Sequence, residues 1–224
     1  MVRRAATEAL GTAFLLMAVV GSGIMAERLS AGNVALALLA NSVATGAALI
    51  ALILAFGPIS GAHFNPAVTL ANALDGGIQW HEVPGYMGAQ FSGAFIGVAS
   101  AHLMFGLPLF SAPHRIRSGP ALWWSEFVAT FGLLAIIWGC SRARPSAIPY
   151  AVGAYIAAAY WFTASTSFAN PAVTLARAAS DTFAGIRPAN APAFIAAQFG
   201  CAVVAPKFFR WLFRSPTVGG REVG

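Results

Sequence analysis

The sequence Asn-Pro-Ala-Val-Thr-Leu-Ala occurs twice in this chain, at residues 65–71 and again, letter for letter, at residues 170–176. Other features return in the same order and with similar spacing. Glu8 has a counterpart in Glu126, and Ala-Gln-Phe at 89–91 recurs at 197–199. A seven-residue identity within 224 residues is far beyond chance. The sequence therefore predicts two copies of one structural unit.

Composition indicates that the solvent around most of the chain is lipid. Hydrophobic residues make up 58% of it and charged residues only 9%, whereas about a quarter of the residues in a soluble domain are charged. A chain of 224 residues holds several spans of about 20 residues joined by short connections. We expect a single membrane domain over residues 1–224, with repeats at about 5–105 and 121–212.

The apolar stretches predict six full membrane spans, near residues 5–26, 33–57, 83–105, 121–140, 147–164 and 190–212. Each half holds three, an odd number, so the second copy enters the membrane with the opposite orientation. Positive residues are in excess on the cytoplasmic side of membrane proteins. We therefore expect both termini in the cytoplasm, because that side then carries Arg3, Arg4, Arg142, Arg144, Lys207, Arg210, Arg214 and Arg221, against Arg28, Arg115, Arg117 and Arg187 outside. This placement explains the net charge of +6 without a nucleic-acid partner.

Each copy of the repeated motif is a favourable helix start, because Asn is a preferred N-cap and Pro suits the first helical position. We expect two half-helices that enter from opposite faces and meet at the bilayer centre, with two positive dipole ends at one point. The cap uses the side-chain oxygen of the asparagine and leaves its amide nitrogen free to donate into a pore. The centre of that pore is expected at Asn65, Pro66, Ala67, Asn170, Pro171 and Ala172.

The segments before the two motifs, Ser-Gly-Ala-His-Phe at 60–64 and Ser-Thr-Ser-Phe-Ala at 165–169, are small or polar and are expected to be non-helical. Irregular backbone at membrane depth is tolerated only where it lines a cavity. Its carbonyl groups would then accept hydrogen bonds from a solute. The expected pore lining is Gly61, Ala62, His63, Phe64, Thr166 and Phe168.

The doubled motif, the Ser-Gly-Ala-His-Phe segment and the paired Glu and Gln positions resemble the aquaporin and aquaglyceroporin family over residues 5–212. The resemblance implies an all-α membrane protein with six transmembrane helices and two half-helices in an inverted repeat. It also implies one pore per subunit, a homotetramer in the lipid bilayer of a cell membrane, here a bacterial inner membrane, and no cofactor or metal. Glu8 and Glu126 would hold the backbone N–H groups of the irregular segments.

One departure from the family pattern concerns the narrow outer filter. Most aquaporins carry arginine directly after the second Asn-Pro-Ala, where this chain has Val173. Ungapped counting from the asparagines places the other filter positions at Thr45, Ala158 and Ser167. All four side chains are small or neutral, so we expect a wide constriction that passes larger neutral polyols. Val173 with Thr45 resembles the filter of bacterial aquaporins linked to arsenic resistance, which implies arsenous acid or methylated arsenicals as solutes.

Two charged or titratable residues allow other interpretations. Arg177 lies seven residues after Asn170 and is a candidate for a displaced filter arginine. We expect an outer-surface or helix-end contact instead, because two helical turns carry it away from the mouth and its counterpart, Asn72, is neutral. His63 is expected to be a wall residue rather than a ligand.

The sequence thus predicts a passive channel for small uncharged solutes, including water, glycerol-like polyols and arsenite. Three alternatives remain open: a water-selective aquaporin, a non-conducting structural membrane protein, and an ion or proton leak permitted by the missing arginine. An enzyme is not expected, because the chain has no HExxH, GxSxG or GxxxxGK[ST] motif and no paired carboxylates in one loop.

Overall fold

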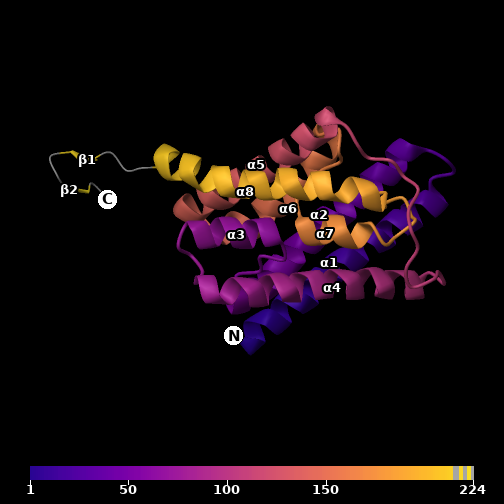
Figure 1. The fold of residues 1–224 in the computed structure, drawn as a ribbon, viewed down its shortest axis with the longest axis horizontal. Coiled ribbons are helices and arrows are strands. Elements are labelled where there is room, and N and C mark those ends of the chain that lie inside the picture. Colours follow the sequence, from indigo (N-terminus) through magenta and orange to yellow (C-terminus); the bar gives the residue numbers. More distant parts are fainter. Residues whose placement is uncertain (214–216, 219–220, 223–224) are drawn as a thin grey trace.

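The computed structural model describes residues 1–213, 217–218 and 221–222, so Arg214 of the sequence argument lies outside the described residues. The described part contains eight α-helices, with the N-terminus and the C-terminal end of α8 at the same end of the molecule (Figure 1). The long helices are α1 (Val2–Leu29), α2 (Val34–Ser60), α4 (Val83–Met104), α5 (Pro120–Ala143), α6 (Ile148–Phe162) and α8 (Ala191–Leu212). The two short ones are α3 (Pro66–Leu74) and α7 (Pro171–Arg177). Short connections contain the 3-10 helices η1 (Trp80–Glu82), η2 (Pro145–Ala147) and η3 (Pro188–Asn190), and the paired strands β1 (Thr217–Val218) and β2 (Arg221–Glu222) follow α8.

This arrangement confirms the predicted fold class of six long helices and two half-helices. Among the described residues, four helical segments are both long and apolar enough to cross a membrane: α1, α2, α5 and Pro188–Leu212. The α6 helix is shorter than the expected span at 147–164. Its 15 residues at about 1.5 Å each fall short of a hydrocarbon core of about 30 Å. It ends because Thr163 takes an extended conformation, with φ of −109° and ψ of 136°.

The half-helices begin at the asparagines, as the motif predicts. Asn65 caps α3, with its Oδ1 atom accepting the N–H of Ala67 at 2.9 Å. Asn170 caps α7, with its Oδ1 atom accepting the N–H groups of Ala172 at 3.0 Å and Val173 at 3.2 Å. The two copies interlock, because α3 packs against α8 and α7 packs against α4, and α3 and α7 also contact each other.

The helices of the two copies approach closely through glycine. A Cβ atom on Gly46 of α2 would lie 2.7 Å from the carbonyl oxygen of Gly153 of α6, and one on Gly153 would lie 2.5 Å from that of Gly46. Small residues of this kind let membrane helices pack backbone against backbone. The α2–α6 contact therefore depends on the absence of side chains at this point.

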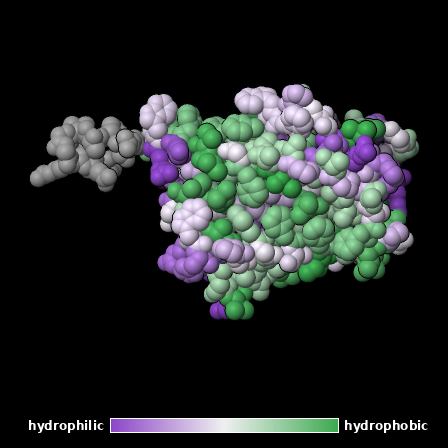
Figure 2. All heavy atoms as spheres, viewed as in Figure 1, coloured by the Kyte–Doolittle hydropathy of each residue, from purple (hydrophilic) through white to green (hydrophobic). Residues whose placement is uncertain are grey.

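The outer surface is apolar over much of its area. Leu39, Val43, Ile96, Leu103 and Val204 are exposed, each at roughly half of its surface or more. Figure 2 shows hydrophobic side chains over the middle of the molecule and hydrophilic ones gathered toward its two ends. Large exposed apolar surfaces mark contact with a membrane or another protein. This distribution fits a chain that is surrounded by lipid along the axis of its helices.

Candidate solute pore

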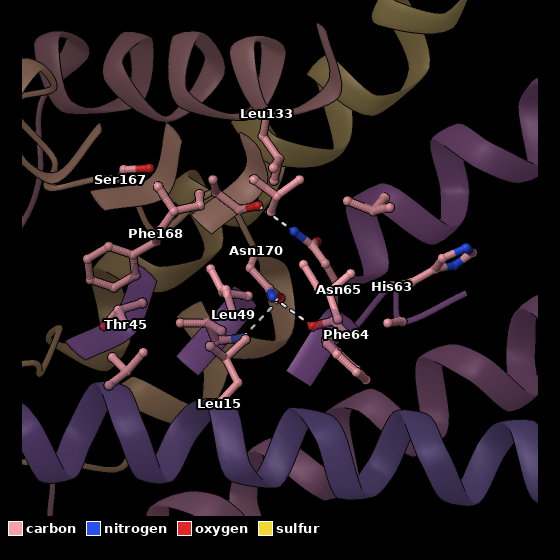
Figure 3. A pocket seen from close by; sticks show the side chains of 18 of the residues that line it. Leu15, Thr45, Leu49, His63, Phe64, Asn65, Leu133, Ser167, Phe168 and Asn170 are labelled. Carbon is pink, nitrogen blue, oxygen red and sulfur yellow. Dashed lines mark hydrogen bonds between the residues drawn. The ribbon is translucent and has the colours of Figure 1, made fainter. Parts of the chain in front are cut away.

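A cavity of about 160 Å³ runs between the helices and the two irregular segments (Figure 3). Both capping asparagines line it, near the middle of the view, with Thr45 and Phe168 at one end and His63 at the other. One wall is apolar and is built from helical stripes at four-residue spacing, which place their side chains on one face. The stripes are Leu15 and Val19 on α1, Leu49 and Ile53 on α2, Leu133 and Ile137 on α5, and Ile148, Val152 and Ile156 on α6.

The two asparagines are linked across the repeat. The amide nitrogen of Asn65 donates to the carbonyl oxygen of Ala169 at 2.7 Å, and that of Asn170 donates to the carbonyl oxygen of Phe64 at 2.8 Å. Figure 3 shows both bonds at the centre of the cavity. Each amide nitrogen carries two hydrogens, so one hydrogen of each remains for a solute. Together the five bonds of caps and amides fix the two half-helices N-terminus to N-terminus.

The segments between the long helices and the motifs have an unusual backbone. Five residues other than glycine have φ between 47° and 63°: Ala62, Phe64, Thr166, Ser167 and Ala169. Such a conformation costs about 1–3 kcal/mol per residue and persists only where the surroundings enforce it. Ser60, expected in the first irregular segment, is instead the last residue of α2, and the chain leaves the helix at Gly61, whose φ is 86°.

In the first copy, Glu8 holds the irregular segment in this backbone conformation. Its Oε1 atom accepts the backbone N–H of His63 at 3.0 Å and its Oε2 atom accepts that of Phe64 at 2.7 Å. Ser60 Oγ and Gln90 Nε2 donate to the same carboxylate at 2.6 Å and 2.8 Å. Hydrogen bonds to an ionised group are roughly twice as strong as neutral ones. The buried carboxylate of α1 thus anchors the irregular segment from the side opposite the cavity.

Glu126 repeats this arrangement in the second copy. It accepts the N–H groups of Phe168 at 2.9 Å and Ala169 at 2.8 Å, and Gln198 Nε2 donates to it at 2.6 Å. Both carboxylates are fully buried. Each therefore has three or more donors, which is the condition under which a buried charge is tolerated.

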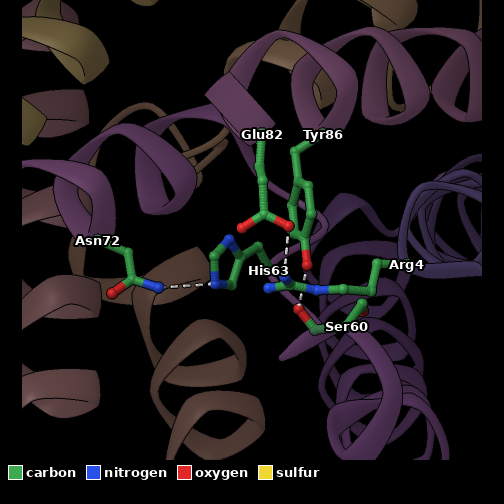
Figure 4. A network of polar contacts seen from close by, with 6 residues as sticks. All are labelled: Arg4, Ser60, His63, Asn72, Glu82 and Tyr86. Carbon is green, nitrogen blue, oxygen red and sulfur yellow. Dashed lines mark hydrogen bonds and ion pairs between the residues drawn. The ribbon is translucent and has the colours of Figure 1, made fainter. Parts of the chain in front are cut away.

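The His63 imidazole lies at the end of the cavity nearest the termini, within a network of side chains (Figure 4). Asn72 Nδ2 lies 3.0 Å from His63 Nε2, and Thr69 Oγ1 lies 3.1 Å from His63 Nδ1. An amide nitrogen only donates, so Nε2 is the acceptor and Nδ1 carries the hydrogen. Both ring nitrogens are thereby engaged. The structure places His63 in the wall, with its polar atoms bonded to protein.

A second part of that network closes the space behind His63. Arg4 Nη1 donates to Glu82 Oε1 at 2.5 Å, and the guanidinium carbon of Arg4 lies 5.1 Å from the ring centroid of Tyr86. The Tyr86 hydroxyl donates to the carbonyl oxygen of Ser60 at 2.7 Å. These bonds tie α1, α2 and α4 together near the N-terminus of the chain (Figure 4).

The comparisons with known proteins agree with this architecture. A model of the major intrinsic protein family matches residues 1–145. The aquaglyceroporin AqpS of Rhizobium meliloti (strain 1021) is 54% identical over 214 residues, which cover 96% of this chain and 91% of the relative. This chain belongs to the major intrinsic protein family.

More distant members of the major intrinsic protein family match parts of the chain. Aquaporin NIP1-1 of Zea mays is 34% identical over 160 residues, which cover 69% of this chain and 56% of the relative. The chain therefore spans little more than half the length of that plant relative. The X-ray structure of the aquaglyceroporin from Plasmodium falciparum has the same fold, with a TM-score of 0.70, 22% identity, and coverage of 93% of this chain and 95% of that one.

Three of the four positions assigned to the family filter line the cavity, namely Thr45, Ser167 and Val173. The fourth assignment, Ala158, is wrong, because that residue is exposed on the outside of α6. Tyr160 lines the cavity instead, and its hydroxyl lies 3.2 Å from Thr45 Oγ1. Two residues along a helix correspond to a rotation of about 200°. Ungapped counting therefore selected a residue on the opposite face.

The other motif residues have different surroundings. Pro66, Ala67, Pro171 and Ala172 are buried but do not line the cavity, so only the asparagine of each Asn-Pro-Ala triplet does. Thr166 lines a second cavity of about 290 Å³ at the end of the pore away from the termini. The remaining expected lining residues border the first cavity: Gly61, Ala62, His63, Phe64 and Phe168.

The outer-surface contact expected for Arg177 is wrong, whereas a contact at the end of α7, the other alternative, is present. Arg177 makes no outer-surface contact, because only 2% of its surface is exposed. Its Nε atom donates to the carbonyl oxygen of Ala184, and its guanidinium carbon lies 3.5 Å from the ring centroid of Phe168. The side chain borders both cavities. In a helix the Cα–Cβ bond tilts toward the N-terminus, so the long side chain returns toward the mouth that its Cα has left.

Arg115 and Arg117 line the outer cavity beside it. Arg115 Nη1 donates to the carbonyl oxygen of Phe183 at 2.9 Å. Arg117 donates from Nε to the carbonyl oxygen of Gly185 at 3.1 Å and from Nη1 to that of Ser165 at 3.3 Å. Burial, and secondly the charge of Arg115, lowers the pKa of Arg117 to about 10, which leaves it charged at neutral pH. These two arginines fasten the connections around the mouth.

Sequence reasoning missed Tyr160 and the apolar stripes, and it named Arg177 only as an alternative that it set aside. A signal for the stripes exists in the repeat. Leu15 and Leu133 both lie seven residues after the paired glutamates, and Val19 and Ile137 both lie eleven after them. The four-residue spacing of Val152, Ile156 and Tyr160 would likewise have selected Tyr160 over Ala158. No comparable signal marks Arg177, because its position depends on how the segment after α7 folds back.

Proposed function

We propose that this chain is a passive membrane channel for small uncharged solutes, passing water and glycerol-like polyols, with arsenous acid and methylated arsenicals as further solutes. The proposal rests on the cavity. It has one apolar and one polar wall, and both capping asparagines line it. The relative at 54% identity is named an aquaglyceroporin. Members of the family are passive channels, and the proposed function involves no catalytic step.

The polar wall supplies both kinds of hydrogen-bonding group. Among the described residues, none donates to the carbonyl oxygens of residues 61–63 or of residues 166–168. These six carbonyl groups are therefore available as acceptors, and the remaining amide hydrogens of Asn65 and Asn170 are donors. A polyol that moves along this wall exchanges hydrogen bonds with water for bonds with the channel, while its carbon chain faces the leucine and isoleucine stripes.

The proposed filter consists of Thr45, Ser167 and Val173, together with Tyr160 in place of Ala158. Val173 has an isopropyl group where most members of the family carry a guanidinium, so it occupies less space and offers no donor. The Ser167 hydroxyl is enclosed and has no partner among the described residues. It would reach a solute only after the side chain rotates, so we assign Ser167 to the filter as a small residue rather than as a donor. We assign the loop-holding role to Glu8 and Glu126, on the hydrogen bonds described above.

The proposed setting is a homotetramer in a bacterial inner membrane with both termini in the cytoplasm. The N-terminus and the C-terminal end of α8 lie at one end of the molecule (Figure 1), and the sequence around them is rich in positive residues. The exposed apolar faces of the helices provide surface for lipid and for neighbouring subunits.

Flux measurements on purified protein in liposomes test this function. Stopped-flow light scattering would follow water, glycerol and urea, and arsenite uptake would be measured on the same vesicles, with protein-free liposomes as the control. We expect all four solutes to enter faster than in the control. Water flux alone would identify a water-selective aquaporin. No flux from correctly folded protein would favour the structural alternative.

A further inference from the structure

The junction between the two cavities is occupied by one side chain. Arg177 is the only residue of the described chain that lines both the inner cavity and the outer one. A solute that passes from the outer cavity to the asparagines therefore passes its guanidinium. The inner cavity at this junction is bordered by Thr45 and Tyr160 on the long helices and by Phe168 beside the arginine.

The side chain is held firmly although its Cα lies about 10 Å along the helix axis from the Cα of Asn170. The guanidinium stacks on Phe168, a residue that precedes Asn170 in the chain. The side chain thus points back toward the N-terminal end of the half-helix. Its Nε atom is fixed by the carbonyl oxygen of Ala184 in the segment that follows α7. The guanidinium is planar, so stacking on one ring and a single hydrogen bond together fix its orientation.

The remaining nitrogens of Arg177 are open to the cavities. Within the described residues, no acceptor bonds Nη1 or Nη2, and neither atom is among the enclosed polar atoms that lack a partner. Arg115 also makes a single side-chain hydrogen bond, and Arg117 donates to Gly185, Ser165 and Thr166, but both of these arginines line only the outer cavity. Arg177 is therefore the guanidinium that brings unbonded donors to the junction of the two cavities.

The charge at the junction has no carboxylate facing it from a cavity wall. Among the described residues that line either cavity, none is aspartate or glutamate. Glu126, which lies behind the wall, is occupied by the N–H groups of Phe168 and Ala169 and by Gln198. A cation that entered the junction would lose hydration and meet a fixed positive charge, whereas a neutral hydroxyl oxygen would meet a donor.

We propose that Arg177 is the filter guanidinium of this channel, supplied from seven residues after Asn170 rather than from the position that holds Val173. It donates from its Nη atoms to the oxygens of neutral hydroxylated solutes and excludes cations. The proposal rests on the channel function above and assigns its selectivity to a residue that the family pattern does not indicate. It also explains how the pore tolerates valine at residue 173.

The test compares Arg177→Gln with wild type and with Arg187→Gln in planar bilayers and in liposomes. Arg187 is an exposed arginine on the same side of the molecule that lines neither cavity, so its substitution removes the same charge away from the pore. We expect wild type and Arg187→Gln to exclude Na⁺ and protons. We expect Arg177→Gln to raise cation conductance by about tenfold or more while water and glycerol flux continue.

Two further measurements keep the result decisive if Arg177→Gln fails to fold. Arg177→Lys keeps the charge but loses the fork, so cation exclusion should persist while glycerol flux changes relative to water flux. Cation conductance through wild type that equals the conductance of an open cation pore would overturn the proposal directly. The proposal would also be overturned if the Arg177→Gln channel still excluded cations. The same holds if the Arg187→Gln channel conducted cations as well as the Arg177→Gln channel does.

The outcome can be separated from a failure of the channel function itself. If wild-type protein passes no neutral solute, the function proposed above is wrong. If wild type passes neutral solutes, and Arg177→Gln passes them but still excludes cations, the proposed channel function is supported and the proposed role of Arg177 is wrong. Adding Val173→Arg to Arg177→Gln should restore cation exclusion, because it returns a guanidinium to the same constriction.

Discussion

Thr45 and Tyr160 face each other across the outer end of the cavity, with their hydroxyl oxygens 3.2 Å apart. Thr45 comes from α2 in the first copy and Tyr160 from α6 in the second, so the width of this end depends on both halves of the chain. The pair also carries the only two hydroxyl groups that the long helices contribute to the cavity lining within the described chain.

We predict that Tyr160→Ala raises glycerol flux relative to water flux, because it removes the largest side chain opposite Thr45 and leaves the asparagines intact. The matched control is Ala158→Leu, which changes a neighbouring residue on the exposed face of the same helix. Light scattering with both solutes gives the ratio. An equal change in both variants would show that α6 packing, not the pore, controls the flux.

The contrast between residues 158 and 160 shows what the sequence could and could not provide. The half-helices were predictable because capping by Asn65 and Asn170 is local and involves residues two or three positions away. Their meeting point followed from the odd number of spans. The facing residue of α6 was not predictable by counting, since the length of the irregular connection between α6 and Asn170 enters the count and varies.

The position of the Arg177 side chain could not be predicted from the sequence, for a different reason. Its position depends on Ala184, seven residues later, and on the ring of Phe168, which lies on the other side of the motif. Neither contact has a sequence pattern, and the first copy has Asn72 at the corresponding position. The repeat that correctly predicted the fold therefore gave the wrong expectation for the residue at which the two copies differ in charge.

We predict that Glu126→Gln lowers the thermal stability of the protein in detergent. The carboxylate accepts two backbone N–H groups and the amide of Gln198, and a glutamine places an NH₂ group where one of these acceptors was. The expected loss is about 1.5–3 kcal/mol for one hydrogen bond to a charged group. The unfolding midpoint measures it. Glu27→Gln, an exposed glutamate of α1, should leave the midpoint within experimental error.

A third prediction concerns the close contact of α2 with α6. Gly153→Ala should destabilise the protein by about 1–3 kcal/mol, the usual range for overpacking a tight core, because its Cβ atom would lie 2.5 Å from a backbone oxygen of Gly46. Gly57→Ala on α2 has no atom within 4 Å of its Cβ and serves as the control. We expect that control to be neutral or slightly stabilising, since alanine favours helix by up to about 1 kcal/mol. Equal midpoints for the two variants would contradict the packing argument.

The last prediction is that Val173→Arg suppresses glycerol and arsenite flux more than water flux, and that it also destabilises the protein. A guanidinium is several heavy atoms larger than the isopropyl group that it replaces, so a solute near the width of the constriction loses more than water does. Residues 173 and 177 lie one turn apart on α7, and both border the cavity. Like charges at this spacing repel by about 0.2–0.5 kcal/mol on an exposed helix, and the repulsion grows where water is excluded.

The double variant Val173→Arg with Arg177→Gln separates the two effects. It removes the like-charge pair, so its unfolding midpoint should recover toward wild type while the narrow filter remains. The flux ratio of glycerol to water should therefore stay low as stability returns. If Val173→Arg leaves that ratio unchanged, Val173 does not set the width of the pore. If the midpoint of the double variant stays at or below that of Val173→Arg, the two side chains do not compete for the junction, and valine at residue 173 needs another explanation.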